Sequence, residues 1–260
     1  MIIGKHRVSV GITLGAAIAL TFLLSDCSKP PEARTNSPST KPESGQTSTI
    51  RVDLKEGGPI ILTTSAAEFQ VRPDGYVQAS LLSDGKKLSL DEPNAGTSGD
   101  SDFARVAGKD MHFNLDFQRS QVREATGKMG AGKRIEIPAR PLETKGTGLQ
   151  AVLALEVYDN FPNLVLSTME YKNAGTTDVT LEKSVNQRRR LNAQLEDAKA
   201  KPWEMWSFHG ASYDWGKDDV LKLTPAFSQP NVMGEMVKGG YGGGIPVVAF
   251  WTRQVGEAIG

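Results

Sequence analysis

Hydrophobic and polar residues alternate along most of the chain after residue 50. The clearest run is 149–158, in which Leu149, Ala151, Leu153, Leu155 and Val157 fall on one side of an extended chain. Successive side chains of a β-strand point to opposite faces, so this period of two predicts a strand with one buried face. Shorter runs predict further strands at 50–54, 60–62, 69–71, 77–81, 111–117, 135–137, 164–171 and 179–181.

Turn signals rich in glycine, proline and asparagine separate these runs. Pro73-Asp74-Gly75 and Ser83-Asp84-Gly85 are the strongest of them. Short strands joined by such turns, without the helices that connect parallel strands, predict an all-β fold, an antiparallel β-sandwich. One short helical insertion is expected over residues 186–201, which are dense in helix-forming residues and are followed by Pro202.

The first 27 residues have the layout of an export signal. Lys5 and Arg7 precede an almost wholly apolar stretch from Val8 to Leu24, and the only cysteine, Cys27, follows. This order resembles a bacterial lipoprotein signal, so we expect lipidation of Cys27 and export to the periplasm or cell surface on a membrane anchor. Because Asp26 stands where a small residue is usual, an uncleaved anchor helix and a plain secretory signal stay open; both also imply export.

Residues 28–49 contain no leucine, isoleucine, valine or aromatic residue. Such a segment buries too little apolar surface to offset its loss of conformational entropy on ordering. We therefore expect a disordered tether over 28–49 and a β-sandwich domain over 50–260.

The charge balance and the cysteine count argue against several classes of protein. Lysine plus arginine and aspartate plus glutamate number 30 each, so the net charge is zero and no nucleic-acid partner is expected. A single cysteine cannot form an internal disulfide or a cysteine-based metal site. The histidines His6, His112 and His209 have no partner at metal-ligand spacing, so we expect neither metal nor cofactor.

Gly127, Gly132 and Lys133 match the spacing of a phosphate-binding loop. That motif requires a hydroxyl residue after the lysine and a helix after the loop. Arg134 stands in the hydroxyl position and a strand pattern follows, so we expect a glycine-rich surface loop there.

Tryptophans gather in the last quarter of the chain, at Trp203, Trp206, Trp215 and Trp251. Flat aromatic faces stack on the C–H patches of sugars, and carboxylates bind sugar hydroxyls. Acidic residues are interleaved with these rings, and the nearest candidates for paired carboxylates are Asp214 with Asp218 or Asp219. We therefore predict carbohydrate binding by Trp206, Asp214, Trp215 and Asp218. The alternative is that the tryptophans fill the sandwich core and the acids are solvated in a loop.

Residues 155–260 carry a family resemblance. It lies in the stretches 156–162, 170–175, 208–215, 242–250 and 255–260. The first two look like a hairpin with an acidic-aromatic-proline turn, and the third like a Phe-x-Gly-x-Trp region. Together they resemble, in divergent form, the N-terminal β-supersandwich of bacterial α-galactosidases, the melibiase-like glycoside hydrolases of family 36.

The resemblance implies a galactose-mutarotase-like supersandwich and an oligosaccharide or glycoside as the partner. In this family a (β/α)8 barrel with two catalytic aspartates follows the sandwich. Residues 1–260 contain no such barrel, so we assign no catalytic residue and expect truncation before it. The leading expectation is the non-catalytic N-terminal domain of an exported, retaining α-galactosidase-like hydrolase. A stand-alone carbohydrate-binding lipoprotein, a structural envelope lipoprotein without a ligand, and a homo-oligomer all stay open.

Overall fold

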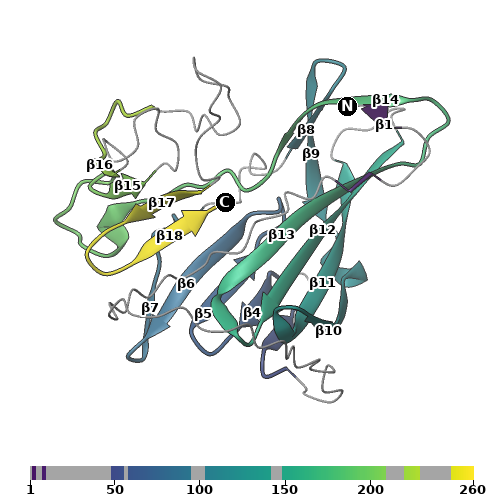
Figure 1. The fold of residues 1–260 in the computed structure, drawn as a ribbon. Helices are drawn as coiled ribbons and strands as arrows, with labels where there is room; N and C mark the ends of the chain where they lie inside the picture. Colours follow the sequence, from purple (N-terminus) through teal and green to yellow (C-terminus); the bar gives the residue numbers. More distant parts are fainter. Residues whose placement is uncertain are drawn as a thin grey trace, which may run out of the picture.

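The computed structural model describes residues 2–3, 8–9, 48–55, 58–94, 103–141, 148–208, 220–228 and 247–260. In these residues the chain forms antiparallel strands in three sheets, together with two short 3-10 turns (Figure 1). The predicted all-β antiparallel fold is therefore confirmed.

The first sheet is a five-stranded meander in which each strand pairs with the next along the chain. Its strands are β3 (Arg51–Leu54), β4 (Ile60–Thr63), β5 (Ala67–Val71), β6 (Val77–Ser83) and β7 (Lys86–Leu88). The two-residue loop between β6 and β7 has a φ of 51° at Asp84 and 71° at Gly85. Positive φ at both positions is the requirement of a type I′ turn, which explains why Asp-Gly occupies it.

The second sheet is larger and supplies most of the core. Its strands are β1 (Ile2–Ile3), β2 (Val8–Ser9), β8 (Phe103–Val106), β9 (Lys109–Leu115), β10 (Gln121–Gly127), β11 (Gly130–Pro141), β12 (Leu149–Tyr158), β13 (Phe161–Asn173) and β14 (Val179–Val185). They follow the order β1-β14-β8-β9-β11-β12-β13-β2, with β10 beside β11. A 3-10 turn, η1 (Phe117–Arg119), separates β9 from β10, and both strands pair with β11.

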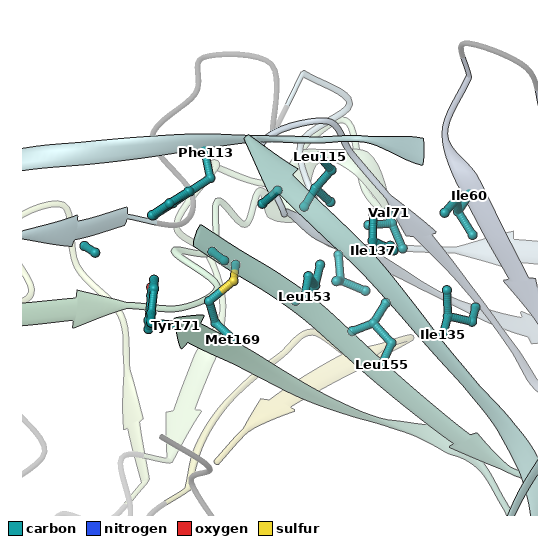
Figure 2. Packing of buried hydrophobic residues seen from close by; sticks show 14 of the residues in the cluster. Ile60, Val71, Phe113, Leu115, Ile135, Ile137, Leu153, Leu155, Met169 and Tyr171 are labelled. Carbon is teal, nitrogen blue, oxygen red and sulfur yellow. The ribbon is translucent and has the colours of Figure 1, made fainter. Parts of the chain in front are cut away.

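The main core lies between these two sheets. Figure 2 shows Ile60 and Val71 of the first sheet near Ile135 and Ile137 of β11, with Leu153 from β12 beside them. All five side chains are at most 1% exposed. Burying an aliphatic side chain of this size contributes about 1.5–3 kcal/mol, so these contacts stabilise the sandwich. The period of two predicted for 149–158 is confirmed, since β12 turns alternate residues into this core.

The third sheet has the order β16-β15-β17-β18 and lies at the upper left in Figure 1, above the meander and to the left of the large sheet. Its strands are β15 (Trp206–Phe208), β16 (Val220–Lys222), β17 (Val248–Trp251) and β18 (Gly256–Ile259). A second apolar cluster joins its inner face to the meander. That cluster includes Leu81 and Leu88 from the meander, and Met205, Val255 and Phe250 from the third sheet and its flanks.

The helical insertion predicted over 186–201 is nearly absent. Only η2 (Ala193–Leu195), a three-residue 3-10 turn, forms there. Gln187 has a φ of 56°, outside the helical region. Its side chain donates to the carbonyl of Gly75 and accepts from the amide of Val77. These contacts with the meander replace the backbone hydrogen bonds of a helix, so tertiary structure overrides local propensity.

The phosphate-loop spacing lies in a β-hairpin, where a glycine-rich surface loop was expected. Gly127 pairs with Gly130 at the turn between β10 and β11, and Gly132 and Lys133 lie within β11. The polar stretch 121–127, for which no strand was predicted, is the edge strand β10.

Part of the N-terminal region contacts the sandwich. Residues 2–3 pair with β14 and residues 8–9 with β13. Thr49, the last residue of the expected tether, donates to the Asp159 carboxylate from its amide and its hydroxyl, over 3.1 and 2.6 Å. Cys27 and residues 28–47 lie outside the described residues. In the described part of the chain no helix is long and apolar enough to cross a membrane.

Candidate functional site

The outer face of the third sheet presents two tryptophans side by side. Trp206 of β15 stands directly opposite Trp251 of β17. Opposite residues of an antiparallel pair share a face, with Cβ atoms about 4.5–5.5 Å apart. The same row continues to Lys222 on β16 and to Gly256 on β18. We call the row formed by Lys222, Trp206, Trp251 and Gly256 the tryptophan face.

The alternation of residues along β15 explains why this face is open. Ser207 lies between Trp206 and Phe208, points to the opposite side and is 0% exposed. That inner side packs on the second apolar cluster, so the side chains of the tryptophan face point away from it. Trp206 is 46% exposed as a result, and Trp251 is half-buried.

Gly256 keeps the flank of Trp251 free. A Cβ atom at position 256 would lie 2.8 Å from the Cβ of Trp251 and 3.2 Å from the carbonyl oxygen of Phe250. Both distances are shorter than an ordinary van der Waals contact. Glycine is therefore required for the present position of Trp251, and no side chain from β18 covers it in this row.

The tryptophan face carries a charged group, and residues just before β15 add charges of both signs. The ammonium group of Lys222 lies 3.7 Å from the Glu204 carboxylate, and both side chains are largely exposed. The ammonium of Lys201 lies 5.9 Å from the ring centroid of Trp203, which is itself 36% exposed. Such a surface offers flat apolar rings together with hydrogen-bond donors and acceptors.

The structure describes only part of the predicted carbohydrate site. Trp206 lies on the tryptophan face, whereas Asp214, Trp215 and Asp218 lie outside the described residues. Sequence reasoning did not pair Trp206 with Trp251, because they are 45 positions apart in the sequence and only the sheet register brings them together. His209 also lies outside the described residues. The groups described include no cluster of histidine, cysteine, aspartate or glutamate suited to a metal ion.

Sequence reasoning also missed a buried polar cluster behind the third sheet. The Tyr76 hydroxyl donates to Asp91, whose other oxygen accepts from the amide of Ala79 over 2.6 Å. Arg189 pairs with Glu257 of β18 and approaches Asp91 at 3.7 Å. The run Arg188-Arg189-Arg190 was the available signal, but it was assigned to a surface helix.

Burial controls the electrostatics of this cluster. Desolvation raises the pKa of Asp91, although the positive charge of Arg189 opposes the shift. Burial, with the negative charge of Asp91 adding to it, raises the pKa of Tyr76. The Asp91 side chain is 0% exposed, so a substrate in solution does not reach it. We therefore assign the cluster a structural role: it joins β18 to the meander.

No family model matches this chain, and no curated protein matches it either.

Proposed function

We propose that this chain is a non-catalytic saccharide-binding β-sandwich protein, exported and lipid-anchored, that forms the N-terminal part of an α-galactosidase-like hydrolase. The observation that carries the proposal is the pairing of Trp206 with Trp251 on the open side of the third sheet. A stand-alone carbohydrate-binding lipoprotein would use the same face.

The chemistry of the tryptophan face favours a neutral polyhydroxylated ligand. Single exposed apolar residues are ordinary on a protein surface, but two indoles on the same face of neighbouring strands add up to a larger apolar area. Sugar rings present C–H groups to such a surface and direct their hydroxyls sideways. The oppositely charged Lys222 and Glu204 then supply a donor and an acceptor without attracting an ion of either sign.

The α-galactosidase resemblance gives separate support to the proposal. Its stretches 156–162 and 170–175 fall on the turn between β12 and β13 and on the end of β13. Its stretches 242–250 and 255–260 include β17 up to Phe250 and the whole of β18. The resemblance thus falls on strands of the large sheet and on strands that carry the tryptophan face. In such a hydrolase a sandwich lends surface to the rim of an active site built by the barrel.

Intrinsic fluorescence tests saccharide binding directly, because all four tryptophans lie between residues 203 and 251. We expect melibiose or raffinose to change the emission of the full chain with a saturating dependence on concentration. Loss of one stacking ring in Trp206→Ala should weaken the apparent affinity at least about tenfold. Phe161→Ala is the matched control, since Phe161 is 44% exposed on the large sheet and should leave binding unchanged.

A flat titration with α-galactosides and with other oligosaccharides would contradict the proposal. The absence of turnover is tested with an aryl α-galactoside, which the chain should not hydrolyse. Hydrolysis that disappears in Asp214→Asn would instead indicate a compact enzyme. Sequencing the coding region downstream for a barrel separates the hydrolase from the stand-alone lipoprotein.

A further inference from the structure

A hollow of about 320 Å³ lies where the two sheets of the sandwich meet. Its apolar lining comes from Pro73, Leu115 and Phe117, and its polar lining from Asn114, Asp116, Gln118 and Arg140. As far as the structure describes it, this lining includes no residue of β15–β18. The hollow is therefore separate from the tryptophan face.

Two backbone hydrogen bonds, one between the sheets and one within the large sheet, hold the walls of the hollow in place. The amide of Leu115 donates to the carbonyl of Pro73 over 2.7 Å, which ties the end of β9 to the turn between β5 and β6. The amide of Asp116 donates to the carbonyl of Pro138 on β11 over 2.8 Å. The chain then forms η1, so Asp116 and Gln118 are carried by a short fixed turn.

A carboxylate and a guanidinium lie together in the hollow. The Asp116 side chain is 8% exposed and is paired with Arg140, whose side chain is 70% exposed. Asn114 is the register partner of Arg140 across β9 and β11, so its amide lies on the same face. A guanidinium has five N–H donors, and the pair with Asp116 leaves donors of Arg140 directed to solvent.

The lining selects the class of ligand by its charge. Because Asp116 and Arg140 compensate each other, neither an anion nor a cation gains from the net field. Two amides, a carboxylate and a guanidinium offer both donors and acceptors, while Pro73 and Phe117 offer apolar contact. A volume of about 320 Å³ is at the small end of the range for ligand pockets, of a size for one sugar unit.

We propose that this hollow binds one neutral hexose unit, as a second saccharide site that shares no residue with the tryptophan face. This second site rests on the proposed function for its ligand class, but different side chains would bind the ligand. Two sites on one chain would increase the avidity for a polysaccharide, because the second contact becomes intramolecular once the first has formed.

Two-dimensional amide NMR of the full chain, titrated with methyl α-D-galactoside, tests the second site. The expected result is saturating shifts of the Asn114, Gln118 and Arg140 amides, with Trp206→Ala leaving them unchanged. Asp116→Asn and Gln118→Ala should each raise the dissociation constant for these shifts, in the first case at least about tenfold. Gln118 is exposed, so its variant keeps the fold, and Arg119→Ala, on the same turn but outside the lining, is the control.

The outcomes separate this inference from the proposed function. Unmoved amides at 114–118 and 140, or shifts that survive in both Asp116→Asn and Gln118→Ala, overturn the second site even when the indole signals respond. Shifts with galacturonate but not with the neutral galactoside also overturn it. Amide shifts here without any response of the Trp206 and Trp251 indoles support the second site and contradict the tryptophan face.

Discussion

The guanidinium of Arg189 lies over the phenol ring of Tyr76, with 4.9 Å between Cζ and the ring centroid. Arg189 also pairs with Glu257 on β18, and the Tyr76 hydroxyl donates to Asp91. One arginine thus joins the start of β6 to the last strand of the third sheet. The position of the tryptophan face therefore depends on buried polar contacts as well as on apolar packing.

Removal of the Asp91 carboxylate should destabilise the protein strongly. In Asp91→Ala the Tyr76 hydroxyl and the Ala79 amide lose their acceptor, and Arg189 loses one of its two carboxylates. Breaking a buried pair from one side costs about 3–5 kcal/mol, because the remaining charge stays buried. Urea unfolding followed by circular dichroism measures the loss.

The exposed pair of Arg51 and Asp53 provides the control for this prediction. Its side chains are 70% and 39% exposed at a separation of 3.2 Å. Surface pairs contribute about 0–1 kcal/mol, so Asp53→Ala should change the free energy of unfolding little. Equal losses in Asp53→Ala and Asp91→Ala would show that the buried cluster has no special role.

The strands of the sandwich were predictable because their signals are local. The alternation of 149–158 and the Asp84-Gly85 turn each determine their own structure, the first through a period of two and the second through positive φ. The polar edge strand β10 gave no such signal. Its residues pair with β11 on one side only, and it has little need of apolar side chains.

The helix predicted over 186–201 does not form, and the buried polar cluster was not predicted. Both failures of prediction have the same physical reason. Arg189 is a good helix former by itself, and its real partners, Asp91 and Glu257, are 98 positions before it and 68 after it. Local propensity contains no information about such partners. The composition of the candidate site was predictable, since tryptophans gather late in the chain, but the register of Trp206 with Trp251 was not.

Stability should fall in acid partly through Glu156. Burial opposes ionisation of this carboxyl, but the Tyr158 hydroxyl and Arg134 outweigh it and lower the pKa of Glu156 below its usual 4.5. A carboxyl with a lowered folded-state pKa stabilises the fold above its unfolded pKa, and this contribution is lost as the pH falls further. The difference in the free energy of unfolding between wild type and Glu156→Gln should therefore be largest at neutral pH and become smaller below pH 4.5.

Urea titrations of both proteins across that pH range measure the difference. Tyr158→Phe is an informative second variant, because it removes the hydroxyl that donates to Glu156 over 2.6 Å. Below pH 4.5, the stability of Tyr158→Phe should depend less on pH than the stability of the wild type. A difference in the free energy of unfolding between wild type and Glu156→Gln that stays constant as the pH falls below 4.5 would contradict the lowered pKa of Glu156.

Gly132→Ala should destabilise the hairpin of β11 and β12. A Cβ atom there would lie 2.2 Å from the carbonyl oxygen of Val157 and 2.8 Å from Cδ1 of Tyr158. The first obstacle is backbone, so β12 must move, and overpacking of this kind costs about 1–3 kcal/mol. Thermal unfolding should show the loss, whereas Gly108→Asn, at a φ of 72° with open space around it, should cost less. Equal effects of the two substitutions would contradict the steric argument.

Gly256→Ala should weaken saccharide binding because it displaces Trp251 together with part of β17. Its Cβ would meet the Cβ of Trp251 at 2.8 Å, so the indole must shift relative to Trp206. Misplacing one of two stacking rings should cost about 1 kcal/mol, or roughly fivefold in the dissociation constant. Fluorescence titration with melibiose measures the change.

Ala258→Ser is the matched control for Gly256→Ala. Ala258 is exposed on the same strand and the same face, but it stands opposite Ala249, one row away from the two tryptophans. Its affinity for melibiose should therefore equal that of the wild type. If Gly256→Ala also binds with wild-type affinity, the position of Trp251 does not matter to the ligand. Trp206 would then act without its cross-strand partner, and the pairing that carries the proposed function would have no consequence for binding.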